Sequence, residues 1–313
     1  MVTTAFHQAI EEGLTASSKY ISSQFFYDDQ GSRIFQDIMR MPEYYPTSCE
    51  FEILSFQALQ IINKLDFSEP FNIVELGAGD GIKTLQLLRK LTELGAYFHY
   101  VPIDISAEAI QALEENMARE LPSLSIKSLV GDYFTQMEVL AQSDIPCLFL
   151  FLGGNIGNYE APQVDDLLSQ FYEQMKPGDK LLTGFDLQKN PITIRRAYDD
   201  SQGITKAFNI NLLHRINREM GGMFLPDQFD FYCDYNPKNG EVRSYLVSLK
   251  SQDVYIEDLE RSFHFDQNEL IWTELSRKYT FAEIEQLARK NGFRVVNHFL
   301  DCKHYFTDSL WVK

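Results

Sequence analysis

The chain has 313 residues, and its 28 Lys and Arg against 45 Asp and Glu give a formal net charge of −17. This acidity argues against a nucleic-acid substrate, because proteins that bind phosphate backbones present clustered Lys and Arg. No apolar run approaches the roughly 20 residues of a membrane-spanning helix. Residues 1–18 also lack the basic and apolar regions of a secretory signal.

The cysteines are scattered along the chain and form no C-x-x-C pair. Such a distribution in a chain of this length is typical of a reducing cytoplasm, so we expect neither a disulfide framework nor a metal site. The 44% apolar and 23% charged content describes an ordinary globular protein. We therefore expect a cytoplasmic monomer that acts on a small molecule and binds neither nucleic acid nor a membrane.

The first half of the chain begins with helical patterns and then alternates between strands and helices. An amphipathic pattern predicts a helix over residues 5–16. A short helix is expected over residues 34–39 and a longer one over residues 49–65. Strands are predicted at residues 71–74, 99–105, 126–130, 147–152 and 180–185, with helices from about residue 83, from 106 and over 162–175. This alternation predicts a doubly wound parallel sheet in an α/β protein.

The alternation of predicted strands and helices ends after residue 186. A long helical stretch over 192–220 is interrupted at 201–203, and period-2 segments follow. These strands are expected at residues 229–235, 242–250 and 262–270, and the closing elements are a helix over 281–291 and strands over 292–296 and 308–312. Asn236-Pro237-Lys238-Asn239-Gly240 has the chemistry of a hairpin turn, so the inserted strands are antiparallel.

Two domains follow from this order of elements. The doubly wound domain is expected to comprise residues 52–188 and 279–313. A smaller α+β domain for the substrate is expected from residues 1–51 and the insert 189–278. An insertion before the last two strands lies on the ligand side of the sheet, because ligands of open α/β sheets bind beyond the carboxyl ends of the strands.

A glycine-rich turn follows the first predicted strand. Residues 75–81 read Glu-Leu-Gly-Ala-Gly-Asp-Gly, and a strand, a glycine turn and a helix let the backbone approach a nucleotide cofactor closely. In a dinucleotide fingerprint the third glycine comes one position later than Gly81 does here, which disfavours a nicotinamide-dependent oxidoreductase. The E-x-G-x-G-x-G form resembles the first motif of the S-adenosylmethionine-dependent methyltransferases, and it places Gly77 and Gly79 at the cofactor.

The ends of the next strands carry polar groups at matching places. Asp104 at the end of the second strand can accept hydrogen bonds from both hydroxyls of a ribose, while Ser106 is better placed to cap the following helix. After the third strand, Asp132 can bind the adenine amino group and Tyr133 can lie on the base. The fourth strand runs into Gly-Gly-Asn-Ile-Gly-Asn at residues 153–158. Together these ends predict a Rossmann-like class I methyltransferase sheet.

Three further stretches are rich in polar groups, at residues 42–47, 196–200 and 273–276. Taken alone, each has a simple structural interpretation. The two tyrosines of the first can be packing, the paired aspartates of the second can cap a helix, and Glu274 and Ser276 can form a solvated strand face. Alternation nevertheless places Glu274 and Ser276 on the same side of a strand.

An ordered series of motifs decides between these interpretations. The motifs are Phe26-Tyr27-Asp28-Asp29-Gln30-Gly31-Ser32, Pro42-Glu43-Tyr44-Tyr45-Pro46-Thr47, the turn at 75–84, the segment at 151–158, Arg196-Ala197-Tyr198-Asp199-Asp200, Phe208-Asn209 and Thr273-Glu274-Leu275-Ser276. This series, nearly from end to end, resembles the histidine-specific Nα-methyltransferase family of ergothioneine biosynthesis. The resemblance implies S-adenosyl-L-methionine as cofactor and free L-histidine as substrate, with trimethylhistidine (hercynine) as product. Methylation of another aromatic amino acid such as tryptophan, or partial methylation, is the alternative.

The resemblance also implies individual roles. The residues that contact the cofactor would be Gly77, Lys83, Asp104, Asp132 and Tyr133. Asn158 and Tyr198 would hold the α-amino and carboxylate groups and serve catalysis, and the imidazole would be held by Glu274, Ser276 and one tyrosine of the pair Tyr44-Tyr45. Retention of this set argues against a non-catalytic binding module on the same fold.

Two positions depart from the pattern of the family. Ser244 stands where the family often has methionine, and Gly154-Asn155 replaces its Ser-Thr. Both departures concern the shape of the substrate pocket and leave the cofactor motifs intact.

Overall fold

The computed structural model describes residues 4–67, 70–140 and 144–313. The chain forms two compact units. Unit 1 combines the residues up to Tyr45 with Lys189–Arg277, and unit 2 combines Pro46–Gln188 with Lys278–Lys313. The first boundary lies at the start of helix α3 (Tyr45–Phe56), whereas the sequence placed it after residue 51, inside this helix. A helix is a single rigid element, so a boundary between units is more readily accommodated at its end.

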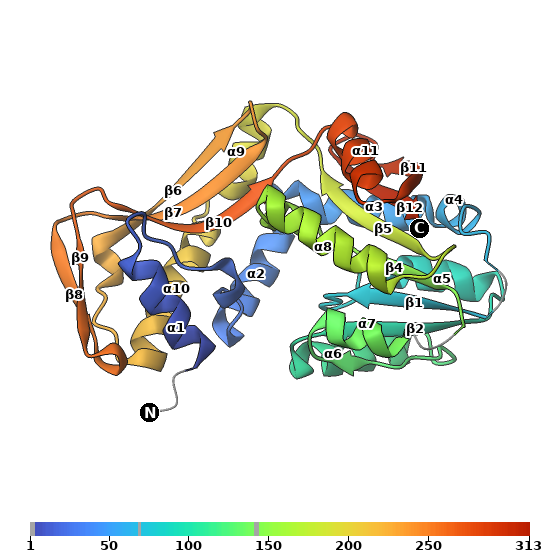
Figure 1. The fold of residues 1–313 in the computed structure, drawn as a ribbon, viewed down its shortest axis with the longest axis horizontal. Helices are drawn as coiled ribbons and strands as arrows, with labels where there is room; N and C mark the ends of the chain where they lie inside the picture. Colours follow the sequence, from blue (N-terminus) through green and yellow to red (C-terminus); the bar gives the residue numbers. More distant parts are fainter. Residues whose placement is uncertain (1–3, 68–69, 141–143) are drawn as a thin grey trace. The chain divides into compact units, whose positions relative to one another are not determined.

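Unit 2 contains a seven-stranded sheet with the order β11-β12-β5-β4-β1-β2-β3 (Figure 1). The strands are β1 (Phe71–Leu76), β2 (Phe98–Asp104), β3 (Leu129–Val130), β4 (Cys147–Phe151), β5 (Lys180–Asp186), β11 (Arg294–Leu300) and β12 (Phe306–Val312). β1 pairs in parallel with β2 and β4, and β4 pairs in parallel with β5. Only β12 breaks this direction, because it is antiparallel to both β5 and β11. This confirms the doubly wound, class I methyltransferase sheet expected from the sequence.

The helices of unit 2 also follow the expected order. They are α3, α4 (Ala58–Ile62), α5 (Thr84–Glu93), α6 (Ala107–Glu120), α7 (Tyr133–Leu140), α8 (Ala161–Gln174) and α11 (Phe281–Lys290). The single helix expected over residues 49–65 is wrong in one respect, because the chain is interrupted at Gln57 and continues as α4. The third strand is also shorter than expected, since Ile126 forms only an isolated bridge with Tyr100.

The central strands of unit 2 are buried along their whole length. All residues of β1 and β4 are buried, as expected for parallel strands that are covered on both faces. One hydrophobic cluster joins residues from these strands with Phe171 of α8 and Trp311 of β12. The rigid sheet therefore fixes the positions of the loops at its carboxyl edge.

Unit 1 combines helices with two small antiparallel sheets. Its helices are α1 (Ala5–Thr15), α2 (Asp29–Arg40), α9 (Pro191–Tyr198) and α10 (Ile204–Met220). One sheet has the order β10-β7-β6, formed by β10 (Leu270–Arg277), β7 (Glu241–Ser248) and β6 (Phe229–Asn236), and β8 (Gln252–Ile256) pairs with β9 (Arg261–Phe265) in the other. The hairpin expected at residues 236–240 is confirmed by the antiparallel pairing of β6 with β7.

The single strand expected over residues 262–270 is wrong. β9 ends at Phe265 and β10 begins at Leu270, with Asn268 between them at φ +68°. A left-handed residue turns the chain, and asparagine tolerates this conformation better than most residues do. The two segments consequently belong to different sheets, and β8, which the sequence analysis did not identify, supplies the partner of β9.

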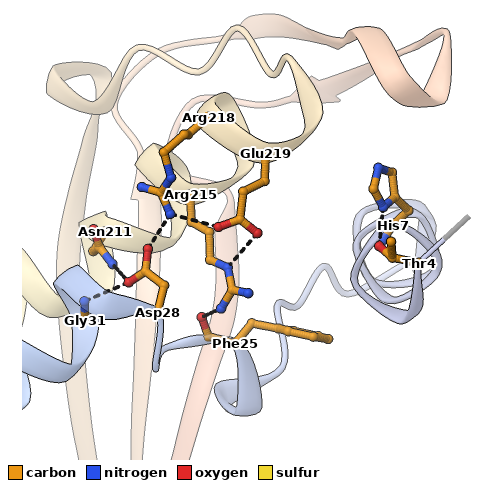
Figure 2. Close-up of polar contacts among 9 residues, drawn as sticks. All are labelled: Thr4, His7, Phe25, Asp28, Gly31, Asn211, Arg215, Arg218 and Glu219. Atoms are coloured by element: carbon orange, nitrogen blue, oxygen red, sulfur yellow. Dashed lines mark hydrogen bonds and ion pairs between the residues drawn. The ribbon is translucent and has the colours of Figure 1, made fainter. Parts of the chain in front are cut away.

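A polar network around Asp28 joins the start of α2 to α10 (Figure 2). Oδ1 of Asp28 accepts hydrogen bonds from the Gly31 amide at 2.7 Å and from Asn211 Nδ2 at 2.8 Å, and Oδ2 pairs with Arg218. Burial opposes ionisation of Asp28, but the bonds from Gly31, Arg218 and Asn211 outweigh it and leave the pKa below its usual value. Nearby, Arg215 donates to the Phe25 carbonyl oxygen at 2.8 Å. The segment before α2 is thereby held against α10.

We expect Asp28→Ala to lower the free energy of unfolding by about 1–2 kcal/mol at pH 7, the usual cost of a lost helix cap. Because the folded state lowers the pKa of Asp28, its contribution is complete above the unfolded pKa of about 3.9 and is lost as the pH falls through the lower folded value. Urea unfolding at pH 7 and pH 3 measures both effects. Asp29→Ala, which removes an exposed carboxylate from the first turn of α2, is the matched control. Equal losses in the two variants would contradict the capping role.

Candidate active site

The glycine turn after β1 has the geometry expected from its sequence. Gly77, Gly79 and Gly81 have φ values of +75°, +54° and +66°, a region that strains residues with a Cβ atom. A Cβ added to Gly77 or Gly79 would meet nothing within 4 Å, whereas one on Gly81 would lie 2.7 Å from Cε of Met117 in α6. The first two glycines therefore leave open space beside the backbone, and the third allows close packing against a helix.

Asp104 at the end of β2 is tied to this turn. Its Oδ2 accepts a hydrogen bond from the Gly79 amide at 3.1 Å, and its Oδ1 accepts one from the Ser106 amide at 3.0 Å. Each carboxylate oxygen has two lone pairs, so both oxygens retain the capacity to accept a ligand hydroxyl. The cap of α6 is made by Ser106, whose Oγ accepts from the Ala109 amide at 3.1 Å. The capping role of Ser106 is the one inferred from the sequence, and the role of Asp104 toward a ribose stays a prediction.

Asp132 and Tyr133 follow β3 in the same unit. Oδ1 of Asp132 accepts hydrogen bonds from the amides of Phe134 and Thr135 at 3.0 and 3.2 Å, so this carboxylate also stabilises the start of α7. Burial and the neighbouring Tyr159 raise the pKa of Tyr133, which therefore remains a neutral phenol at pH 7. The capping role of Asp132 was not predicted from the sequence.

Lys83, between the glycine turn and α5, forms an ion pair with Glu50 of α3. The lysine side chain is 23% exposed and the glutamate is fully buried. Burial would lower the pKa of Lys83, but the charge and hydrogen bond of Glu50, followed by Glu75 and Asp308, raise it overall. Lys83 is accordingly a fixed cation with part of its surface available to a ligand. Glu50 was not identified from the sequence, since only the fold brings it to the lysine.

Glu75, the acid that precedes the first glycine, is buried rather than directed to solvent. It accepts hydrogen bonds from the hydroxyls of Thr84 and Tyr100. Burial is the largest influence and raises its pKa to about 7, against the opposing effect of these hydrogen bonds. The motif acid thus connects β1, β2 and the start of α5 inside unit 2.

Asn158 ends a short 3-10 helix, η2 (Asn155–Asn158), which follows β4. Its side chain is exposed. The preceding Gly153 and Gly154 have φ values of +81° and +69°, so the chain turns sharply before η2. Asn158 therefore belongs to unit 2, together with all the residues expected at the cofactor.

The remaining residues expected to bind the substrate belong to unit 1. The hydroxyl groups of Tyr198 in α9 and Ser276 in β10 lie 2.9 Å apart, and both side chains are buried. The ring of Tyr44 lies 6.0 Å from that of Tyr198 in an edge-to-face arrangement. Tyr45 instead accepts a hydrogen bond from Lys189 at 2.8 Å. The structure thus brings Tyr44, Tyr198 and Ser276 together.

Glu274 is placed by an irregularity in β10. The pairing with β7 shifts between Trp272 and Glu274, so Glu274 faces Ser244 directly. The intervening Thr273 is buried, and its hydroxyl lies 2.6 Å from Oδ1 of Asn209 in α10. Beyond this bulge the pairing is regular, so Glu274 and Ser276 share a face of the strand. Ser244 is therefore the cross-strand neighbour of the carboxylate expected to select the ring.

Tyr27 is a further residue near Glu274 to which the sequence analysis gave no role. Desolvation of the phenol, and then the negative charge of Glu274, raise the pKa of Tyr27, although the residue is 49% exposed. In the sequence, Tyr27 lies between Phe26 and Asp28, and the hydrogen bonds of Asp28 hold this segment in position. This neighbourhood is the feature of the sequence that could have identified Tyr27.

These features define the class of the protein as an S-adenosylmethionine-dependent methyltransferase with a seven-stranded sheet. A model of the family described as "Histidine-specific methyltransferase, SAM-dependent" matches residues 6–313. The chain belongs to this family.

Individual relatives are similar over most of their length. The chain is 31% identical over 309 residues to a histidine N-alpha-methyltransferase of Mycolicibacterium smegmatis, covering 99% of this chain and 95% of the relative. It is 34% identical over 275 residues to the enzyme of the same name from Mycobacterium tuberculosis, covering 88% of this chain and 84% of that relative. An L-tryptophan methyltransferase of Psilocybe serbica is 26% identical over 326 residues, covering 96% and 91%.

Among the described residues, no helix is long and apolar enough to cross a membrane. The four cysteines all lie in the described residues, no disulfide joins them, and three of them are buried.

We expect Asp104→Ala to weaken binding of S-adenosylmethionine by about 1.5–3 kcal/mol, the usual value of hydrogen bonds to a charged group. The free energy of unfolding should also fall, by about 1–3 kcal/mol, because the variant loses the hydrogen bonds that the carboxylate accepts from the Gly79 and Ser106 amides. Calorimetric titration with the cofactor and a thermal unfolding curve measure the two quantities. Asp80→Ala, which alters the same turn while leaving the end of β2 intact, is the control. An unchanged cofactor affinity in Asp104→Ala would contradict the assignment.

Proposed function

We propose that the protein transfers methyl groups from S-adenosylmethionine to the α-amino nitrogen of free L-histidine. The observation that carries the proposal is the hydrogen-bonded group of Tyr198 and Ser276 with Tyr44 beside it, followed on the same strand face by Glu274. Family membership over residues 6–313 supports the reaction class, and the mycobacterial relatives support histidine as the amino acid.

In this proposal the cofactor occupies the carboxyl edge of the sheet in unit 2. Gly77 and Gly79 provide the open backbone, and Asp104 accepts the hydroxyls of the ribose. Asp132 and Tyr133 are assigned to the adenine, and Lys83 to the carboxylate of the methionine moiety, where its raised pKa keeps it charged. A cation is the appropriate partner for that group, because charge-assisted hydrogen bonds are the stronger ones.

The substrate residues divide between the two ends of the amino acid. Asn158 and Tyr198 are assigned to the α-amino and carboxylate groups, and Glu274 and Ser276 to the two edges of the imidazole. Of the tyrosine pair, we assign Tyr44 to the substrate, because its ring packs beside Tyr198 while the hydroxyl of Tyr45 is bound to Lys189.

Methyl transfer requires the protein to orient the amine and to remove water from it. When bound, the cofactor supplies an electrophilic methyl group on a good leaving group. The amine must be neutral to attack, because an ammonium has no lone pair, and Asn158 can orient it without acting as a strong base. With the cofactor bound, its methyl group would pass to the amine nitrogen oriented by Asn158, the thioether would leave, and the proton of the amine would pass to water or to a nearby tyrosine. Holding the two reactants at attack distance can supply roughly 7–11 kcal/mol of the barrier lowering.

Glu274 acts through specificity in this scheme. It accepts a hydrogen bond from a ring N–H, and a substrate whose ring places no N–H at that point loses this hydrogen bond as water is expelled. Such a loss costs about 1–3 kcal/mol or more. The alternative substrate is tryptophan, since a relative is named for that amino acid and the buried Ser244 opposite Glu274 is smaller than methionine.

We further propose that transfer continues to the trimethylated product, and that the protein acts as a cytoplasmic monomer. The four described cysteines remain thiols and form no disulfide, which supports a reducing compartment. Mass spectrometry of each of the twenty amino acids incubated with the cofactor would identify both the substrate and the number of methyl groups. Products from tryptophan alone would contradict the proposal.

We expect Glu274→Ala to reduce histidine turnover at least tenfold, about 1.4 kcal/mol or more in the activation free energy. The preference for histidine over tryptophan should narrow at the same time, because the hydrogen bond from the imidazole N–H is lost, whereas an indole carries its N–H at a different place on a larger ring and depends less on this carboxylate. A competition between the two amino acids measures both changes.

Glu241→Ala provides the matched control for Glu274→Ala. It removes a carboxylate of the adjacent strand β7 that pairs with Arg243 at 2.9 Å. The control should leave the preference ratio unchanged. A ratio in Glu274→Ala equal to that of the parent protein would remove Glu274 from the binding site.

A further inference from the structure

Unit 2 buries a group of carboxyl side chains around one lysine. Glu50, Glu75 and Asp308 are at most 4% exposed, and all three act electrostatically on Lys83. An unpaired buried charge is strongly unfavourable, so each of these groups needs a partner or a proton. The hydrogen bonds of Glu75 with Thr84 and Tyr100 account for one of them.

Glu50 extends from α3 to two loops at the carboxyl edge of the sheet. Its Oε1 accepts a hydrogen bond from the Gly153 amide at 2.7 Å, and its Oε2 pairs with Lys83. Gly153 begins the sharp turn that leads to Asn158, and Lys83 follows the glycine turn after β1. A single carboxylate therefore holds a cation on one side and a backbone amide on the other, and both donors favour its ionised form.

Asp308 of β12 has a different environment. It lies against Glu50, and among the described residues neither of its oxygens receives an N–H or hydroxyl hydrogen bond. Two ionised carboxylates in contact would repel each other strongly away from water. Burial and then Glu50 raise the pKa of Asp308 far above its usual value. A protonated Asp308 is neutral, and its hydroxyl can donate to Glu50.

The sheet leaves space for this arrangement. Gly184 of β5 pairs in register with Asp308, and a Cβ atom at position 184 would collide with Oε1 of Glu50 and lie 3.0 Å from Cζ of Phe306. Glycine weakens a strand interior and usually marks a close approach of other groups. Here the approaching group is the Glu50 carboxylate, which extends from α3, contacts the turn at Gly153 and lies against β5 at Gly184.

We propose that Glu50 is a positioning residue for both ligand sites of unit 2, and that a protonated Asp308 supports it by donating a hydrogen bond to its carboxylate. Glu50 fixes the ammonium of Lys83 beside the glycine turn and fixes the turn that carries Asn158. The inference rests on the proposed function through the roles given to Lys83 and Asn158. It adds a residue that touches neither ligand but determines where the groups that do touch them are held.

The first experiment measures steady-state kinetics of Glu50→Gln with saturating histidine. The amide keeps the size of the side chain but removes the charge that orients Lys83. We expect KM for S-adenosylmethionine to rise at least tenfold, with a smaller fall in kcat. Glu52→Gln changes a partly buried carboxylate of the same helix that binds the Cys302 amide at 2.8 Å, and it should leave both constants unchanged. Unchanged constants in Glu50→Gln would overturn the proposal.

The second experiment follows Lys83 without methyl transfer. Acetic anhydride labelling of the folded full-length protein, followed by peptide mass spectrometry, reports how readily each lysine reacts. Loss of the Glu50 charge lowers the pKa of Lys83, so its labelling rate should rise severalfold in Glu50→Gln, with the exposed Lys290 as internal reference. This result is independent of substrate identity. If the parent enzyme fails to methylate histidine, the proposed function fails, while the labelling ratio still decides whether Glu50 positions Lys83.

A pair of variants tests Asp308 and also covers the case in which Glu50→Gln does not fold. Asp308→Asn retains a hydrogen-bond donor toward Glu50, whereas Asp308→Ala removes it. We expect KM for S-adenosylmethionine to be at least fivefold lower in the asparagine variant than in the alanine variant. Equal KM values and equal Lys83 labelling in these two variants would overturn the role of Asp308 as a hydrogen-bond donor to Glu50 and, with it, the proposal.

Discussion

The hydrogen bond between the Gly79 amide and Asp104 joins the ends of two neighbouring parallel strands. Asp104 also receives the Gly131 amide on its main-chain oxygen at 2.9 Å, which brings in the end of β3. One residue therefore ties together the loops after β1, β2 and β3. The parallel direction of these strands makes this possible, because it places their carboxyl ends at a common edge. The expected cofactor residues depend on that common edge for their relative positions.

Local chemistry in the sequence was sufficient to predict the framework of unit 2. The positive φ values of Gly77, Gly79 and Gly81 follow from a turn that only glycine accommodates easily. Asp104 and Ser106 could be assigned different roles, because a cap and a strand-tip acid occupy different positions relative to the helix. Each of these features depends on residues that are neighbours in the chain, and such short-range patterns can be recognised in the sequence without a structure.

Features that depend on distant parts of the chain could not be predicted in this way. Glu50 reaches Lys83 and Gly153 only after α3 has packed on the sheet. The bulge at Thr273 depends on Asn209 of another element, and alternation alone does not reveal the register shift. The prediction of one strand across residues 262–270 was wrong for a related reason. Apolar and polar residues can continue to alternate across a turn, so alternation alone does not show that the strand has ended.

The close approach of Glu50 to Gly184 has a consequence for the evolution of this chain. Any side chain at position 184 would occupy the volume of the Glu50 carboxylate, and a shorter side chain at position 50 would leave a cavity over the strand. The two positions lie on different elements and are far apart in the chain, yet neither can change alone without a steric or a packing defect. Sequences that have diverged from this one should therefore show covariation between positions 50 and 184: glycine retained wherever the glutamate is retained, and a larger residue on the strand only where the helix has lost its acid.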